Sequence, residues 1–346
     1  MKISIGTQTK DGPWGGGNLF AINLSKYLIS KGYEVVNNLK DKDIDIILIT
    51  EPRKTSESSA FTHIDVENYL NFINPQALVA HRINECDERK NTNFVNKYLI
   101  EANKIADHTI FVSRWLKNLY LTQGINRKNN NVILAGADAE IFNNNGLSSW
   151  NSNQKLKIVT HHWGASWNKG FEIYEFIDEL LMNDYWKEKI DFTYIGNLPK
   201  KFNFKNSNYY EPMSGLKLAS KLKEHNIYLT GSINEPSGNH HIEGAQCGLP
   251  IMYIDSGGVA EYCKEYGIEY KKNDLEEKFN YIFKNYDYYF ERMKNYPFNS
   301  LKMCQDFENL FNVMIKNKQE LLEIRTLRDR NAISKKYYLI KNRFLN

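Results

Sequence analysis

The sequence has little cysteine and no long apolar run, and each absence excludes a class of protein. Four cysteines are spread over 346 residues with no Cys-x-x-Cys pair, so we expect free, mostly buried thiols rather than a disulfide framework or a thiolate zinc site. No stretch approaches the roughly 20 apolar residues that cross a bilayer. The N-terminus, MKISIGTQTKDG, lacks the apolar core and cleavage site of a signal peptide. These features predict a cytoplasmic protein.

Neither charge sign dominates the body of the chain. The net charge is +4, but seven basic residues and one acid from Arg325 to Asn346 contribute +6, and +4 minus +6 leaves −2 for the rest. A nearly neutral body argues against nucleic acid as the main partner. The basic tail also carries apolar side chains, which leaves two interpretations open. It is either a helix end docked on the body or a peripheral contact with the anionic inner face of the membrane.

The chain is long enough for two domains, and its pattern repeats. Short runs rich in Ile and Val alternate with helical segments, which favours parallel sheets covered on both faces. A linker rich in Asn, Ser and Gly, 143–154, separates the halves. We expect domains 1–150 and 151–300, then a helical segment, 301–346, that could return to the first domain and ends in the basic tail. The expected strands are 2–7, 45–50, 77–81, 108–112, 131–134, 156–160, 191–196, 227–230, 251–255 and 268–270. The expected helices are 18–31, 93–105, 114–122, 171–182, 216–224, 240–247 and 259–266, and the chain beyond about Asp274 is expected to be helical.

One segment late in the chain combines carboxylates with exposed backbone amides. A strand ends at Thr230, the turn GSINEPSG follows, and a helix begins near Asn239. A helix N-terminus offers unpaired N–H groups and partial positive charge. Glu235 lies in the turn and Glu243 one turn inside the helix, so both can face one ligand. A Ser-Gly-Gly turn at 256–258 directs further amides to the same place. Carboxylates for hydroxyls beside amides for phosphate predict a nucleotide-sugar site.

This segment resembles the donor-site signature of the retaining glycosyltransferases of family four. The matching residues are Glu235, Glu243, Ala245, Cys247-Gly248-Leu249-Pro250, Asp255, Gly257-Gly258 and Glu261. Other landmarks follow in the family's order: Gly15-Gly16-Gly17, Ala106-Asp107, Val112-Ser113, Ala135-Gly136-Ala137-Asp138 with Phe142, and Lys169-Gly170. The resemblance covers about residues 6–265. It implies a GT-B fold, in which two Rossmann-like domains face each other across a cleft. It also implies transfer of a sugar from a nucleoside-diphosphate sugar to a glycan or lipid-linked acceptor, with retention of anomeric configuration.

The resemblance also implies a role for each matching residue. Glu235 would contact the donor sugar near the reacting carbon and Glu243 would hold the ribose hydroxyls. Lys169 would neutralise the diphosphate as the bond breaks. His81 matches a histidine that sits beside the transferred sugar, and no metal cofactor is expected. The remaining donor-side residues are Gly15, Gly16, Gly17, Gly238, Asn239, His240, Gly257 and Gly258.

The sequence departs from the family in two places. Many relatives carry Gly-Arg five or six residues before the lysine, where the arginine contacts the diphosphate, but here the pair is Trp163-Gly164. Arg82 and Arg114, both assigned to the acceptor side, and His162 are candidates to replace that charge. The helix positions between the two glutamates, usually apolar, include His240 and a second histidine, which could read the sugar.

Plainer interpretations stay open for single residues. Lys169 also fits an exposed lysine at a helix start, and His81 fits a satisfied histidine at a strand end. The histidine pairs 161–162 and 240–241 suggest zinc, but adjacent side chains point in different directions and match no known ligand spacing, so we expect no metal. The rival functions are a sugar-nucleotide epimerase of the same fold and a non-catalytic nucleotide-sugar-binding subunit. A third is nucleic-acid binding through the tail.

Overall fold

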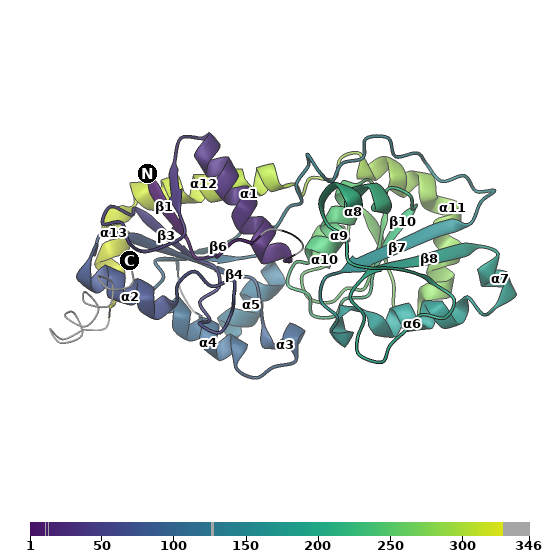
Figure 1. The fold of residues 1–346 in the computed structure, drawn as a ribbon, viewed down its shortest axis with the longest axis horizontal. Coiled ribbons are helices and arrows are strands. Elements are labelled where there is room, and N and C mark those ends of the chain that lie inside the picture. The colour runs from purple at the N-terminus through teal and green to yellow at the C-terminus, as the bar shows by residue number, and fades with distance from the viewer. Residues whose placement is uncertain (11, 13, 126–127, 328–346) are drawn as a thin grey trace.

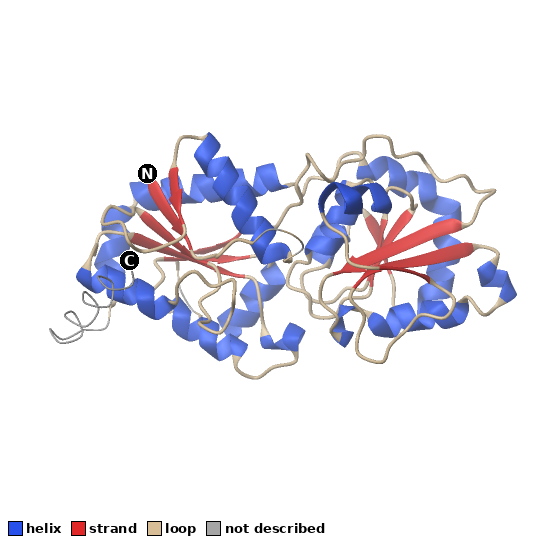
Figure 2. Ribbon diagram, in the orientation of Figure 1, coloured by secondary structure: helices blue, strands red, loops and turns tan. Residues whose placement is uncertain are grey.

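The chain forms two α/β domains joined where the backbone crosses between them twice (Figures 1 and 2). The computed structural model describes residues 1–346 except 11, 13, 126–127 and 328–346. Each domain contains a six-stranded sheet in which every paired strand is parallel. Parallel strands need long crossover connections, and the helical segments between the strands supply them.

The N-terminal sheet has the strand order β2-β1-β3-β4-β5-β6. Its strands are β1 (Lys2–Ile5), β2 (Glu34–Val36), β3 (Ile46–Ile49), β4 (Leu78–Ile83), β5 (His108–Phe111) and β6 (Asn130–Val132). Its helices are α1 (Gly16–Ser30), α2 (His63–Phe72), α3 (Asp87–Lys90), α4 (Val95–Asn103) and α5 (Arg114–Thr122). All residues of β3 and β4 are buried, as expected for central strands covered on both faces.

The C-terminal sheet repeats this plan with the order β12-β11-β10-β7-β8-β9. Its strands are β7 (Leu156–His162), β8 (Ile190–Gly196), β9 (Asn208–Tyr210), β10 (Ile227–Thr230), β11 (Ile251–Tyr253) and β12 (Gly267–Glu269). The helical elements are η1 (Trp167–Lys169), α6 (Phe171–Leu180), α7 (Asp184–Lys187), α8 (Gly215–Leu222), α9 (Asn239–Gln246), α10 (Ala260–Cys263), η2 (Lys272–Asp274) and α11 (Leu275–Met293). Helices α8 and α9 cover one face, and α6 and α11 cover the other.

After α11 the chain returns to the N-terminal domain. Helix α12 (Ser300–Lys316) lies along α1, with the rings of Phe20 and Phe307 5.1 Å apart, and α13 (Lys318–Ile324) follows it (Figure 1). The return crosses beside the first linker, where the Ser300 amide donates to the Ala137 carbonyl at 2.7 Å. The two crossings therefore form a single joint between the domains.

A second contact joins the domains near the ends of their strands. The carboxylate of Glu261 accepts hydrogen bonds from the backbone amides of Arg114 (2.8 Å) and Trp115 (2.9 Å) at the start of α5. A carboxylate at a helix N-terminus satisfies free N–H groups and complements the helix dipole. The Tyr262 hydroxyl donates to the Val112 carbonyl at 2.7 Å. These contacts hold the N-terminal end of α5 against α10.

No helix in the described part of the chain is both long and apolar enough to span a membrane. The basic segment predicted as a tail begins at Arg325, and its residues from 328 onward lie outside the described residues.

Candidate active site

A cavity of about 460 Å³ lies between the two domains, beyond the carboxyl ends of both sheets. Its N-terminal wall comes from the glycine loop before α1 and the segments after β4 and β6. Its C-terminal wall comes from the segments after β7, β8, β9 and β10. Doubly wound α/β proteins bind ligands at this edge of the sheet. The predicted site residues that line the cavity are Glu235, Lys169, Glu243, Gly238, Asn239, His240, Gly15, Gly16, Gly17 and Arg82.

Glu235 occupies a turn that two neighbouring loops hold in place. Its carbonyl accepts the Gly258 amide at 2.8 Å, and the Asn234 amide donates to Ser256 Oγ at 2.8 Å. Asn234 itself adopts the left-handed conformation (φ 53°), which asparagine tolerates better than most residues. The loop after β11 therefore fixes the turn after β10, and that turn aims the carboxylate of Glu235 into the cavity.

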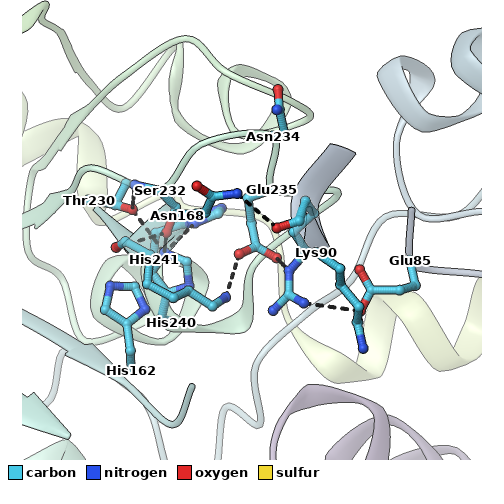
Figure 3. A network of polar contacts seen from close by, with 12 residues as sticks. Glu85, Lys90, His162, Asn168, Thr230, Ser232, Asn234, Glu235, His240 and His241 are labelled. Carbon is cyan, nitrogen blue, oxygen red and sulfur yellow. Dashed lines mark hydrogen bonds and ion pairs between the residues drawn. The ribbon is translucent and has the colours of Figure 1, made fainter. Parts of the chain in front are cut away.

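The Glu235 carboxylate bridges two cations from different domains, within the network in Figure 3. Lys169 Nζ lies 2.5 Å from Oε2, and Arg89 Nε lies 3.1 Å from Oε1. Burial alone would raise the pKa of Glu235, but attraction to Arg89 and Lys169 outweighs burial and lowers that pKa well below its ordinary value. Glu235 is therefore an ionised carboxylate at neutral pH.

Glu243 lies on α9, lines the same cavity and is paired with His161. His161 Nε2 lies 2.8 Å from Oε2 of Glu243, and His161 Nδ1 lies 3.1 Å from the Tyr228 hydroxyl. Because a carboxylate oxygen can only accept, His161 donates to Glu243 from Nε2. His161 comes from the end of β7, so the two central strands of the sheet position this pair.

Three further histidines, His162, His240 and His241, lie near Glu235 (Figure 3). The His162 and His240 rings are 4.3 Å apart, and those of His240 and His241 are 4.8 Å apart. Burial lowers the pKa of all three, that of His241 to about 3, so they are neutral. Among the residues that the structure describes, no group of three or more His, Cys, Asp or Glu side chains is arranged to hold a metal ion.

The N-termini of two helices face the cavity from opposite domains. Helix α1 begins after Gly15 (φ 81°) and α9 begins after Gly238 (φ 77°), both in a conformation that favours glycine. A Cβ on Gly16 would lie 2.8 Å from the side chain of Asn239, so glycine is what lets the two helix ends approach. Their unpaired amides and partial positive charge form an anion-binding environment.

The predicted position of His81 beside a transferred sugar is corrected by the structure. Its side chain is fully buried in β4 on the face that packs against α4, and Nδ1 lies 3.1 Å from Nδ2 of Asn103. Burial lowers the pKa of His81 to about 3. Successive side chains of a strand point to opposite faces of the sheet, so His81 and Arg82 lie on different faces. Arg82 lines the cavity and His81 does not.

The glycine pair 257–258 and Arg114 also lie outside the cavity lining. Gly258 uses its amide to support the Glu235 turn, and Gly257 pairs with the backbone of Glu235. The sequence predicted that these two glycines hold a diphosphate, but in the structure they support the turn that carries Glu235. Arg114 contributes its backbone amide to the contact with Glu261, and its side chain does not reach the cavity.

Arg89, which comes from the short helix α3, lines the cavity but was not predicted from the sequence. Of the three candidates for the missing charge, burial keeps His162 neutral, Arg114 lies elsewhere and Arg82 stacks on Phe20 with its guanidinium carbon 4.0 Å from the ring centroid. Only the absence of a family arginine near Lys169 pointed to a further cation. The motif DERK carries no signal that would place its arginine in the other domain's turn.

No protein-family model matches the sequence, and no curated protein is similar to it in sequence. Solved structures are similar in fold. A glycosyltransferase from Rickettsia africae has a TM-score of 0.66 at 15% identity, over 91% of this chain and 99% of that one. HepE from Anabaena in complex with UDP-glucose has a TM-score of 0.67 at 12% identity, over 90% of this chain and 100% of that one. Sucrose-phosphate synthase from Thermosynechococcus elongatus has a TM-score of 0.61 at 12% identity, over 91% of this chain and 99% of that one. The chain therefore has the GT-B fold that its sequence predicted, with two Rossmann-like domains.

Proposed function

We propose that the chain is a retaining glycosyltransferase that uses a nucleoside-diphosphate sugar and a glycan or lipid-linked acceptor. The main support is the Glu235–Lys169 pair inside the inter-domain cavity, with Glu243 in the same cavity. Carboxylates accept hydrogen bonds from sugar and ribose hydroxyls, while a lysine and two helix N-termini stabilise a diphosphate. One solved structure of similar fold holds UDP-glucose, so UDP-sugars are the first donors to test.

In the proposed reaction, the bond between the sugar's C1 and the β-phosphate oxygen breaks, and its electron pair leaves with the phosphate. An acceptor hydroxyl oxygen bonds to C1 on the same face, and its proton passes to the departing phosphate oxygen. Lys169 stabilises the charge that develops on that oxygen, and the proposal needs no metal ion. We assign Glu235 to positioning the sugar, because two cations already hold its oxygens and reduce their nucleophilicity.

We place the acceptor on the N-terminal side of the cavity, where Arg82 lies near the end of β4 and Asn84 follows the strand. This side is formed by segments of the first domain only, whereas Glu235, Glu243 and Lys169 all belong to the second. A donor bound to the second domain would thus meet an acceptor bound to the first. The arrangement uses the cleft that two facing sheets create.

The first experiment is a thermal-shift screen of nucleotide sugars, because a ligand that binds only the folded state raises the melting temperature. The stabilising donor is then incubated with alkyl glycosides and membrane lipid extracts, and NMR identifies the product. A new glycoside with the donor's anomeric configuration supports the proposal, and inversion contradicts retention. Free sugar epimer would identify an epimerase. Binding without any turnover would identify a non-catalytic subunit, and the absence of any shift would overturn a nucleotide-sugar site.

A further inference from the structure

Arg89 lies in the candidate active site although its helix belongs to the opposite domain from Lys169. Its Nε is 3.1 Å from Glu235 Oε1, and its Nη1 is 3.0 Å from Glu85 Oε2. It lines the same cavity as Lys169. Attraction to Glu235 raises the pKa of the guanidinium, so Arg89 keeps its charge. One carboxylate thus holds two cations at the boundary between the domains.

The backbone of α3 is fixed from both sides, so the position of Arg89 is built into the fold. In its own domain, Asp87 accepts the amides of Val95 (2.9 Å) and Asn96 (3.0 Å). From the other domain, Asn168 Nδ2 donates to the Arg89 carbonyl at 3.1 Å, and Asn234 Nδ2 donates to the Glu88 carbonyl at 3.2 Å. Asn168 directly precedes Lys169 in the sequence, and Asn234 directly precedes Glu235. The same segments that carry the site therefore hold α3.

Arg89 and Lys169 share one carboxylate. Glu235 pairs with both of these cations, and Glu85 pairs with Arg89 and with Lys90, which lies outside the cavity lining. Among the described residues, no group accepts a hydrogen bond from Nη2 of Arg89. Buried charge is costly unless it is paired, and the N-termini of α1 and α9 add to the positive potential. The cluster is therefore suited to an additional anion.

We propose that Arg89 is the second cation for the donor's diphosphate, which it would bind together with Lys169. This inference rests on the proposed function. The C-terminal domain carries Trp163-Gly164 where the resemblance leads one to expect an arginine, and Arg89 supplies that charge from the N-terminal domain. The guanidinium fork suits phosphate oxygens, and Nη2 is available to begin the contact. Glu235 orients Arg89 until the diphosphate arrives.

A diphosphate held by Arg89 and Lys169 would also connect the two domains. Lys169 follows β7 in the second domain, and Arg89 follows β4 in the first. An anion between them strengthens the closed arrangement, in which Asn168 and Asn234 already contact α3. Donor binding would therefore stabilise the closed cleft before the acceptor reacts.

Calorimetric titration tests the assignment with UDP, dTDP, GDP and ADP on the full chain, followed by the monophosphate of the base that binds best. Arg89→Gln should weaken binding of that diphosphate by roughly 10-fold or more, because a charge-assisted hydrogen bond is lost, and weaken the monophosphate by less than about threefold. Arg89→Lys, which keeps the charge, should recover part of the loss. Lys90→Gln is the matched control, since Lys90 lies on the same helix, pairs with Glu85 at 3.2 Å and does not line the cavity.

Each outcome decides a different point, with melting curves used to confirm that every variant is folded. Equal losses for diphosphate and monophosphate would mean that Arg89 only holds the domains together. An unchanged diphosphate affinity with a weakened nucleotide-sugar affinity would assign Arg89 to the sugar. Either result overturns the inference but keeps the nucleotide site. If the wild-type chain binds none of the four diphosphates, the proposed function itself fails.

Discussion

Glu235 is the residue on which the site depends, because it is buried against cations from both domains. About 7% of its side chain is exposed, compared with 10% for Lys169 and 25% for Arg89. An ionised carboxylate is stable in such a place only when its partners remain charged and close. Because Arg89 reaches it from the other domain, its electrostatic environment depends on domain closure as well as on its own turn. Glu235 thus links the charges of the site to the arrangement of the two domains.

Glu235→Gln is expected to abolish most transfer activity and to lower stability. A neutral amide cannot balance Lys169 and Arg89, so we expect a loss of about 3 kcal/mol in the free energy of unfolding, near the lower end for breaking a buried ion pair. The chain should still fold, because the turn is held by backbone contacts with Gly258. Denaturant unfolding and donor turnover measure the two effects.

Glu57→Gln is the control for this variant. Glu57 pairs with Lys10 at 2.5 Å, but about 74% of its side chain is exposed, and exposed pairs contribute little. We expect the free energy of unfolding of this variant to stay close to that of the wild type, with normal turnover. Near-normal turnover of Glu235→Gln would contradict the site assignment.

Buried histidines predict how stability depends on pH. Burial lowers the pKa of His81 to about 3 from an ordinary value of 6.5. Between these values the unfolded chain binds a proton that the folded chain excludes, so stability is complete above pH 6.5 and falls as the pH drops toward 3. Between these two pH values, each such histidine changes the free energy of unfolding by about 1.4 kcal/mol per pH unit.

His81→Gln isolates this contribution, because glutamine can still bond to Asn103 but does not titrate. Urea unfolding at pH 7, 6 and 5 should show that the free energy of unfolding falls less steeply with decreasing pH in the variant than in the wild type. The difference should be about 1.4 kcal/mol per pH unit at the lower end of this range. Parallel declines for the two proteins would show that His81 is protonated in the folded state.

At the level of elements, strong apolar runs made most of the fold predictable. The central strands and the helices of residues 114–122 and 171–182 appear within a few residues of their expected bounds. The missed strands and α-helices are β2, β9, α2, α3 and α7. All residues of β9 are exposed, so no apolar pattern marks it. Helix α2 does have a signal, since Thr62 and Asp65 form a capping box, but its interior is too polar to show helical periodicity clearly.

The candidate site was predictable where one segment carried its chemistry. Glu235, Glu243 and the N-terminus of α9 lie within nine consecutive residues, so their order in sequence is nearly their order in space. Arg89 was not predictable in this way, since 146 residues separate it from Glu235 and only the docking of the two domains brings them together. His81 was placed wrongly because a one-residue step along β4 changes which face a side chain occupies.

The approach of α1 and α9 gives a prediction at this scale. Gly16→Ala should widen the cleft, because its Cβ would lie 2.8 Å from the side chain of Asn239. Gly17→Ala is the matched variant, since no heavy atom lies within 4 Å of the added Cβ. Small-angle scattering should give a larger radius of gyration for Gly16→Ala than for Gly17→Ala. Identical radii would show that Asn239 moves aside without any change in domain spacing.

For the whole molecule, Arg325 lies near the end of the described residues and is the first residue of the basic tail. Its Nε donates to Asp107 Oδ1 at 2.8 Å, and its Nη2 donates to the Ala77 carbonyl at 2.6 Å. Asp107 also accepts the Val79 amide at 2.7 Å, so these contacts fasten the end of α13 to the N-terminal sheet. A truncation that tests the tail must therefore keep Arg325, and a chain ending at Leu327 does so.

The membrane interpretation of the tail makes a measurable prediction for that truncation. Residues 328–346 hold six basic residues and one acid, a net +5 that anionic lipids would attract at about 1 kcal/mol per basic residue near the surface. The full chain should then sediment with vesicles of phosphatidylglycerol and phosphatidylcholine, while the chain ending at Leu327 stays in the supernatant. Raising the salt concentration should release the full chain, because screening weakens surface attraction. Equal sedimentation of both chains would instead favour a tail docked on the body, and the protein would then have to meet any lipid-linked acceptor through its cleft alone.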